Sequence, residues 1–347
     1  MNDKEKATPM LQQYLEVRER YPNCVLFYRL GDFYEMFYED AVNISKELEL
    51  TLTSRAGTPM CGVPYHACDA YIKKLTNKGY RVAICEQLED PATTKGLVKR
   101  DVVRIITPGT VIEEGMLQED KNNYIASLYL QGESCGMVFA DVSTGEFHIT
   151  EKTGANLEQN IIDELARYQP VELIFNEAFL DLKNVHDFIH NRLMVKFGEV
   201  LTQEQFEPAN AEALLKQFVT ESSGELPESL CMAKKAVMAV FVYINDSYKN
   251  ETPRAVRFFV HGANEFMELN LTTRRNLELT ETMRNKERRG SLLWVLDRTH
   301  TSMGKRKLKQ FISQPLLDHM KIVARLDAVE QLCRNVVGSG ELCAALS

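Results

Sequence analysis

A phenylalanine and a glutamate two residues apart, Phe33 and Glu35, are side chains whose types and spacing could do chemistry. The apolar run 24–28 precedes them and predicts a buried strand. Gly31 interrupts that run, and Asp32 can serve as the N-cap of a following helix. The apolar positions of this predicted helix recur with helical spacing at Met36, Phe37, Ala41, Ile44 and Leu48. Phe33 would then lie at a strand-to-helix corner, where an aromatic ring could insert between base steps and kink a duplex.

The same pattern has a purely structural interpretation. Asp32 and Glu35 have the spacing of a capping box, in which the glutamate reaches back to a backbone N–H. Phe33 could likewise be an ordinary ring of the core. The local pattern alone favours this structural interpretation.

Longer stretches distinguish the two interpretations. Residues 31–38 (GDFYEMFY) closely resemble the mismatch-recognition signature of the bacterial DNA mismatch-repair MutS family. Further stretches match this family in order: 60–66, 85–93, 103–110, and 301–306 with Pro315-Leu316. The resemblance runs over essentially the whole chain. It implies that Phe33 stacks on a mispaired base and that Glu35 hydrogen-bonds to that base.

The resemblance also implies further contacts to DNA close to the ring of Phe33. The additional residues expected near the duplex are Leu30, Asp32, Arg55, Met60, Gly62 and Pro64. A small residue such as Gly62 would let the backbone approach DNA closely. Gly62 and Pro64 belong to a predicted turn-rich loop, so turn formation alone is the alternative for these two.

Charge is distributed unevenly along the chain. The net charge of −8 argues mildly against non-specific binding to nucleic acid. Residues 274–309, however, contain eleven basic and four acidic residues, a net charge of +7. A DNA footprint is a local property, so we expect phosphate contacts from Arg104, Arg274 and Arg275. A solvated helix face would explain the same cluster.

The fold class expected is a multidomain α/β protein. Strands alternating with helices predict a mixed α/β mismatch-recognition domain at residues 1–113. A polar linker leads to a second α/β domain at 121–250, which the resemblance identifies as a ribonuclease-H-like connector. A hinge at 250–254 follows, and residues 258–347 are expected to begin an all-α core that is truncated.

Asp141 supports a rival hypothesis. The Asp-x-Ser-Thr-Gly stretch between two predicted strands resembles the metal or phosphate site of ribonuclease-H-like nucleases and actin-like kinases. A metal-dependent nuclease or phosphotransferase would need several converging carboxylates, and no second acid has a comparable context. A zinc site could also be formed by Cys61, His66, Cys68 and Cys85. These residues lack the usual Cys-x-x-Cys spacing, so no metal site is expected. A scaffold that binds only proteins is a further alternative.

The sequence has no Gly-x-x-x-x-Gly-Lys-Ser/Thr loop, so the chain is not expected to be an enzyme. The family's ATPase, with its ATP and Mg²⁺, would lie outside what we expect to be an N-terminal fragment. The expected ligand is double-stranded DNA with mismatches or small unpaired loops, and the resemblance implies a homodimer and a MutL-type partner. With no signal peptide or membrane-length apolar segment, a cytoplasmic, nucleoid-associated protein with free thiols is expected.

Overall fold

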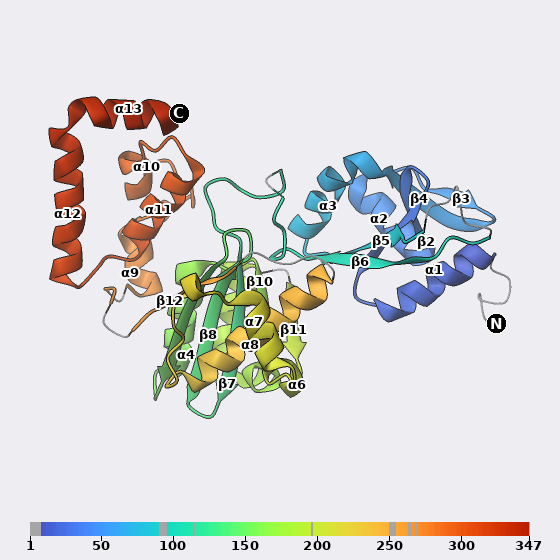
Figure 1. The fold of residues 1–347 in the computed structure, drawn as a ribbon, viewed down its shortest axis with the longest axis horizontal. Coiled ribbons are helices and arrows are strands. Elements are labelled where there is room, and N and C mark those ends of the chain that lie inside the picture. Colours follow the sequence, from blue (N-terminus) through green and yellow to red (C-terminus); the bar gives the residue numbers. More distant parts are fainter. Residues whose placement is uncertain are drawn as a thin grey trace.

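The computed structural model describes residues 8–89, 96–113, 115–195, 197–249, 255–262, 265–267 and 269–346. Along the chain these form an α/β domain, a second α/β domain and a group of helices (Figure 1). The first domain lies at one end of the molecule in this view, and the C-terminal helices lie at the other. The predicted α/β multidomain organisation is therefore confirmed. No helix of the described ranges is both long and apolar enough to cross a bilayer.

The first domain is a six-stranded sheet with helices on both faces. Strand order is β3-β4-β2-β1-β5-β6, in which β1 and β5 are parallel and all other neighbours antiparallel. Its elements are α1 (Pro9–Arg20), β1 (Val25–Leu30), β2 (Phe33–Phe37), α2 (Tyr38–Leu48), β3 (Thr53–Arg55), β4 (Thr58–Pro64), η2 (Tyr65–Ala67), α3 (Cys68–Asn77), β5 (Val82–Gln87) and β6 (Arg100–Ile106). Helices α2 and α3 pack on one face, and α1 packs on the other (Figure 1).

The segment 31–38 forms a β-hairpin and its second strand. Leu30 of β1 pairs with Phe33 of β2, so Gly31 and Asp32 make a two-residue turn. Gly31 has a φ of +57°, a left-handed conformation that costs little energy only in a residue without a side chain. The prediction that Asp32 caps a helix was wrong, and the capping-box alternative fails with it.

Helix α2 begins instead at Tyr38, without a side-chain cap. Met36 and Phe37 are buried on opposite faces of β2, which explains why two adjacent apolar residues suited a helical pattern. Ala41, Ile44 and Leu48 are buried on α2, as predicted.

The predicted turn-rich loop around Gly62 is also a strand. β4 pairs with β2 on one side and with the short β3 on the other. Cys61 and Val63 are fully buried, whereas Met60 and Gly62 lie on the opposite face. This alternation, hidden by Pro59 and Pro64, was the missed signal.

The second domain, the connector, has a second six-stranded sheet. Strand order is β11-β10-β7-β8-β9-β12, with β7, β8 and β9 antiparallel and the outer strands joined in parallel. Its elements are β7 (Tyr124–Gln131), β8 (Ser134–Asp141), β9 (Glu146–Thr153), α4 (Leu157–Tyr168), β10 (Glu172–Asn176), η3 (Glu177–Asp181), α5 (Lys183–Phe188), η4 (Ile189–Leu193), β11 (Phe197–Leu201), α6 (Gln203–Phe206), α7 (Ala211–Phe218), η5 (Glu221–Ser223), α8 (Cys231–Tyr248) and β12 (Arg257–Val260). The hinge predicted at 250–254 lies outside the described residues.

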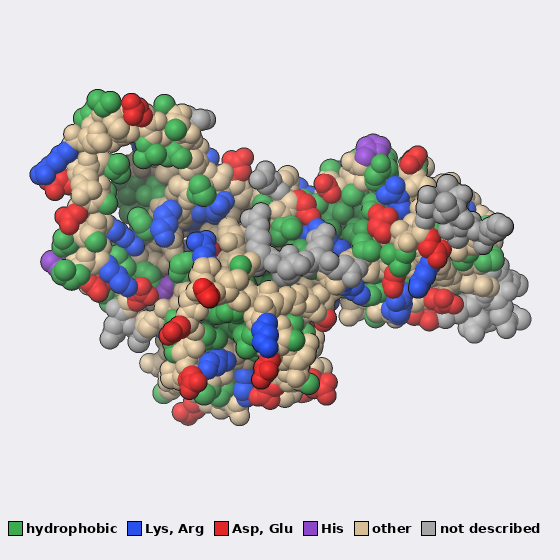
Figure 2. Space-filling view, viewed as in Figure 1, with side chains coloured by type: hydrophobic (Ala, Val, Ile, Leu, Met, Phe, Trp, Pro, Cys, Tyr) green, Lys and Arg blue, Asp and Glu red, His purple; other side chains and the backbone are tan. Residues whose placement is uncertain are grey.

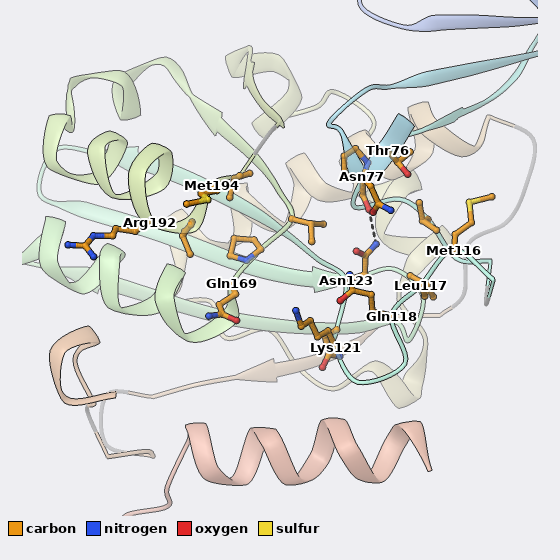
Figure 3. A pocket seen from close by; sticks show the side chains of 17 residues that line it. Thr76, Asn77, Met116, Leu117, Gln118, Lys121, Asn123, Gln169, Arg192 and Met194 are labelled. Carbon is orange, nitrogen blue, oxygen red and sulfur yellow. Dashed lines mark hydrogen bonds between the residues drawn. The ribbon is translucent and has the colours of Figure 1, made fainter. Parts of the chain in front are cut away.

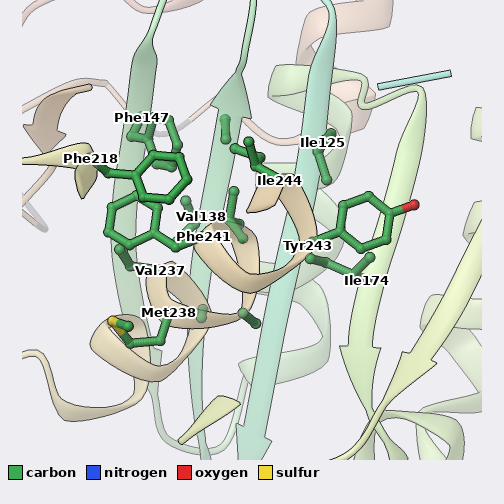
Figure 4. Packing of buried hydrophobic residues seen from close by; sticks show 14 of the residues in the cluster. Ile125, Val138, Phe147, Ile174, Phe218, Val237, Met238, Phe241, Tyr243 and Ile244 are labelled. Atoms are coloured by element: carbon green, nitrogen blue, oxygen red, sulfur yellow. The ribbon is translucent and has the colours of Figure 1, made fainter. Parts of the chain in front are cut away.

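The apolar helix α8 forms the centre of the connector core (Figure 4). The ring of Phe241 stacks on Phe218 of α7, with centroids 4.5 Å apart. At Gly136 a Cβ would lie 2.1 Å from the backbone of Met232, so this glycine lets the start of α8 cross β8. The opposite face of the sheet is covered by α4 and α5.

A buried carboxylate joins the first domain to the connector. Glu172 is fully buried and accepts hydrogen bonds from the Thr107 hydroxyl and the Gly109 N–H, both at 2.7 Å. The Tyr243 hydroxyl donates to its other oxygen, and Figure 4 shows this ring beside Ile125 and Ile174. The segment that follows β6 is therefore fixed to the connector core.

From residue 271 onward, helices alternate with turns and loops. Its helices are α9 (Leu271–Asn276), α10 (Leu292–Leu296), α11 (Ser302–Ser313), α12 (His319–Arg334) and α13 (Val336–Leu346). Each of the helices α9 to α12 begins at a residue whose side chain accepts a backbone N–H, such as Thr301 for α11. Several apolar side chains of this part, including Trp294 and Leu326, are exposed.

Candidate DNA interface

The sheet face that packs against α1 is only partly covered. Paired residues of neighbouring strands share a face. Three rows therefore cross this face: Leu30–Phe33–Pro64, Tyr28–Glu35–Gly62 and Phe37–Met60. Tyr14 of α1 packs edge-on against Tyr28 and Phe37, with ring centroids 5.4 and 5.1 Å apart. The row that contains Phe33 is the one farthest toward the hairpin turn.

Phe33 is exposed on this open part of the face. Its exposed fraction is 46%, whereas Tyr34, the next residue, is 6% exposed on the other face. The alternative that Phe33 is a core ring was therefore wrong. Because Phe33 is paired with Leu30 on one side and Pro64 on the other, its backbone position is set by the sheet.

Glu35 lies on the same face, one row inward from Phe33. It is 7% exposed, and its Oε2 forms an ion pair with Arg55 Nη1 at 2.7 Å. Burial raises the pKa of Glu35, against the opposing effect of Arg55. At Gly62, which pairs with Glu35, a Cβ would lie 3.4 Å from the Glu35 Cγ. The glycine thus leaves room for the carboxylate.

The other predicted contacts surround these two. Asp32 is exposed in the hairpin turn, and Leu30, Met60 and Pro64 are half-buried. Arg55 lies on the short edge strand β3 with its side chain 46% exposed. The structure therefore brings together, from four strands and one turn, residues that are up to 34 positions apart in sequence.

Sequence analysis missed two residues that support the hairpin from behind. The Arg29 guanidinium lies 3.7 Å from the ring centroid of Tyr65. The Tyr65 N–H donates to the Asp32 carbonyl at 2.9 Å, which ties the turn to the end of β4. Tyr65 lies within the matching stretch 60–66, but a matching stretch does not say which of its residues supports a turn.

Known proteins are similar to this chain in sequence along most of its length. Three family models match in order: MutS domain I at residues 8–115, MutS domain II at 123–254 and MutS domain III at 272–347. The DNA mismatch repair protein MutS of Ruminiclostridium cellulolyticum is 46% identical over 331 residues, which are 94% of this chain and 38% of that protein. The MutS protein of Alkaliphilus oremlandii is 43% identical over 347 residues, covering 97% and 39%.

The chain belongs to the MutS family. It spans less than two-fifths of the length of these curated relatives. The open face with Phe33 and Glu35 lies wholly within the part that matches MutS domain I.

Arg104 lies away from the MutS domain I face that carries Phe33. Its Nη1 pairs with Glu113 at 2.5 Å, and its guanidinium carbon lies 4.8 Å from the ring centroid of Tyr248 in the connector. Only 15% of its side chain is exposed. The phosphate contact predicted for Arg104 stays a prediction, and it would require this ion pair to break.

The remaining two predicted phosphate contacts, Arg274 and Arg275, lie on α9 in the part that matches MutS domain III. Arg275 is exposed. Arg274 is half-buried, and its Nε donates to the Leu269 carbonyl at 2.8 Å. In Figure 1 this helix lies at the opposite side of the connector from the hairpin, so neither arginine adjoins Phe33.

None of the predicted contacts lines either of two large cavities of the chain. One, of about 400 Å³, lies between the first domain and the connector, where Asn77, Met116 and Asn123 line it together with Arg192 and Met194 (Figure 3). The other, of about 930 Å³, lies between the connector and α11. The residues around Phe33 therefore lie on an open surface and not in a cavity.

The Asp141 carboxylate is occupied by hydrogen bonds. Its Oδ1 accepts from the Ser143 hydroxyl at 2.6 Å and from the N–H groups of Ser143 and Thr144 at 3.0 and 3.3 Å. Its Oδ2 accepts from the Asn122 side chain at 2.9 Å and from the Asn123 N–H at 3.2 Å. These contacts close the β8–β9 turn and fix the linker, which explains Asp141 without a metal.

The cysteines are all free thiols. Cys61 is buried on the sheet face beneath α2 and α3, whereas Cys85 is buried on the α1 face. These two residues cannot converge on one zinc ion, and the described residues hold no cluster of three His, Cys, Asp or Glu side chains suited to a metal.

Proposed function

We propose that this chain binds mispaired or unpaired bases in duplex DNA by inserting the ring of Phe33 between base steps. The observation that carries the proposal is the exposed ring on a rigid strand, with the buried acceptor Glu35 one row behind it. Every relative described above is a DNA mismatch repair protein by name.

The discrimination would be indirect. Kinking a normal duplex costs several kcal/mol, and a mispaired step is easier to unstack and bend. A ring that enters wherever the step yields would distinguish paired from mispaired DNA without reading sequence. Stacking on the ring would return about 1–3 kcal/mol per base.

Glu35 would act as a conditional acceptor. A carboxylate brought toward a polyanion is unfavourable unless a donor meets it. A displaced, mispaired base can offer such a donor, whereas the edge of a paired base is already occupied. The ion pair with Arg55 holds the carboxylate in place and leaves half of the Arg55 side chain free to approach phosphate.

The rest of the chain would serve the same function. The strand order β9-β8-β7-β10-β11, three antiparallel strands followed by two parallel ones, supports a ribonuclease-H-like connector. By analogy with the family, the connector would recruit a MutL-type partner, and the working unit would be a cytoplasmic, nucleoid-associated dimer. ATP and Mg²⁺ would bind only in longer family members, because the nucleotide-binding loop is missing here.

Replacement of Phe33 tests the wedge. We expect Phe33→Ala to weaken binding to a G·T-mismatched duplex by about 1–3 kcal/mol, which is roughly five- to 150-fold, and to leave matched binding nearly unchanged. Trp294→Ala is the matched control, because Trp294 is an aromatic residue that is 47% exposed on α10, away from the site. Titration of both duplexes by fluorescence anisotropy measures the effect. An equal loss on both duplexes would refute the wedge.

Replacement of Glu35 should reduce discrimination in a different way from replacement of Phe33. We expect Glu35→Ala to lose discrimination partly by tightening binding to matched duplex, because a negative charge that faces DNA is removed. If Glu35 only anchors Arg55, the variant should instead weaken both complexes alike. The same titration separates the two outcomes.

A further inference from the structure

Basic side chains gather where the connector meets the C-terminal helices. Figure 2 shows Lys and Arg side chains concentrated along this border. Two adjacent cavities of about 70 Å³ each lie there, between the end of α4, α9 and α11. Arg167 of α4 and Lys309 of α11 line both of these junction cavities.

Two buried donors at the junction cavities lack an acceptor among the described residues. Arg167 Nε and Arg274 Nη2 are buried without a hydrogen-bond partner in the described part of the chain, and the Tyr168 hydroxyl lies beside the side chains of Gln314 and Arg167. Tyr168 as a whole is only 7% exposed. Lys309 makes no ion pair with any described residue. A buried donor without an acceptor costs about 1–3 kcal/mol, and more if it is charged, so such groups normally mark a missing partner.

The charges that surround the junction cavities are unbalanced. The described lining of the first cavity adds Lys121 and Arg306 and contains no acid. The lining of the second contains Arg274, Arg275 and a single acid, Glu281. The buried acid nearest to Arg167, Glu164, forms ion pairs with Arg167 and Lys152 at 3.0 and 3.5 Å, although its Oε2 makes no hydrogen bond to a described residue.

The pKa shifts of two of these cations agree with this imbalance. Burial and the neighbouring Arg167 lower the pKa of Arg274 to about 10. Burial and the neighbouring Lys121 also lower the pKa of Lys309. Both cations therefore lie where a negative charge would stabilise them.

The position of Arg167 has a simpler partial explanation. It lies in the last turn of α4, where a cation favours the helix dipole. Arg274 and Lys309, however, come from two other helices, and the dipole of α4 does not account for three half-buried cations in one place.

We propose that the junction cavities bind a phosphate group, held by Arg167 and Tyr168 of the connector and by Arg274 and Lys309 of the C-terminal helices. Two guanidinium groups, an ammonium group and a hydroxyl group approach from three elements, which suits the tetrahedral oxygens of phosphate better than a planar carboxylate. The bound group would join the connector to α9 and α11. This site is independent of the wedge at Phe33.

Thermal unfolding of the full chain tests the site. At constant pH and ionic strength, inorganic phosphate should raise the melting temperature above its value in chloride, with sulfate acting similarly and acetate not. Lys309→Met and Arg274→Gln should each weaken phosphate binding, measured by calorimetric titration, by about tenfold or more. Arg289→Gln, which replaces an exposed arginine of the same part of the chain, is the control and should bind phosphate like the wild type.

The source of the phosphate is separated by a second comparison. A short single strand with a 5′-phosphate should compete with inorganic phosphate only if the site takes nucleic-acid ends, and its unphosphorylated counterpart should not compete. In chloride, Lys309→Met should melt no lower than the wild type, because it removes a half-buried charge that forms no ion pair with a described residue. The proposal is overturned if phosphate has no more effect than chloride, or if Lys309→Met and Arg289→Gln bind phosphate equally.

Discussion

The two junctions of the connector solve the problem of buried charge differently. At the junction with the first domain, Glu172 is fully buried and receives three hydrogen bonds, and the Tyr248 hydroxyl donates to the Thr110 carbonyl at 2.6 Å. Buried N–H groups without an acceptor among the described residues occur at both junctions, on Arg104 at the first and on Arg167 and Arg274 at the second. Arg104 is paired with Glu113, however, whereas Arg274 and Lys309 form no ion pair with a described residue.

This difference indicates at which junction the charges are paired within the described part of the chain. A buried charge whose hydrogen bonds are all made holds its neighbours in one arrangement, whereas an unpaired one favours any arrangement that supplies a partner. We therefore expect the first domain and the connector to behave as one unit. The arrangement of the C-terminal helices should instead depend on a bound partner such as the phosphate group proposed above.

The largest effect on the difference between the two junctions is expected when the Glu172 carboxylate is removed. Glu172→Ala leaves three donors buried without an acceptor, so we expect the free energy of unfolding to fall by about 3–5 kcal/mol. Urea unfolding followed by circular dichroism measures the change. Glu204→Ala, at an exposed glutamate of the same domain, should change stability by less than about 0.5 kcal/mol. Similar losses in the two variants would show that the Glu172 contacts do not stabilise the junction.

A smaller effect is expected from the partner segment. At Gly109 a Cβ would lie 2.2 Å from the Ile125 Cγ1 and 2.9 Å from the Glu172 Oε2. Gly109→Ala should therefore cost about 1–3 kcal/mol of stability through forced displacement. Gly115→Ala is the control, because a Cβ there would meet no atom within 4 Å. Equal melting temperatures for the two variants would contradict the close contact.

The smallest effect is a pH dependence. Burial raises the pKa of Glu172 above 4.5, the ordinary value for a glutamate. The folded state thus binds the carboxyl proton of Glu172 more tightly than the unfolded state does. The stability that this bound proton contributes is complete below pH 4.5 and is lost as the pH rises through the pKa of Glu172 in the folded state. Glu172→Gln, which cannot ionise, should gain stability relative to the wild type over that range. Urea unfolding between pH 4 and pH 8 measures the difference, and a constant difference would refute the shift.

Elements with strong local periodicity could be predicted from the sequence. Helix α4, over Leu157–Tyr168, and the apolar run 232–244 within α8 are of this kind. Both have long amphipathic or apolar patterns that only a helix explains. The hairpin at Gly31 could not be predicted in this way, because a glycine and an acid before apolar residues suit a turn and a helix start equally.

The candidate site shows the same division. The residues Phe33 and Glu35 were identified through a resemblance, but their arrangement on one open face depends on the pairing of β1, β2 and β4. Strand register is set by contacts between distant segments and has no local signature. For the same reason the sequence could not show that Arg104 pairs with Glu113 or that Glu172 meets Gly109.

The mounting of Phe33 on a paired strand has a mechanical consequence. A ring on a flexible loop would adapt to whatever DNA it met and would share the deformation with it. A ring held between two strands yields little, so the strain of contact falls on the duplex. As the proposed wedge, such a ring would respond to the stiffness of DNA, and it would detect a mismatch as a position where the duplex bends easily.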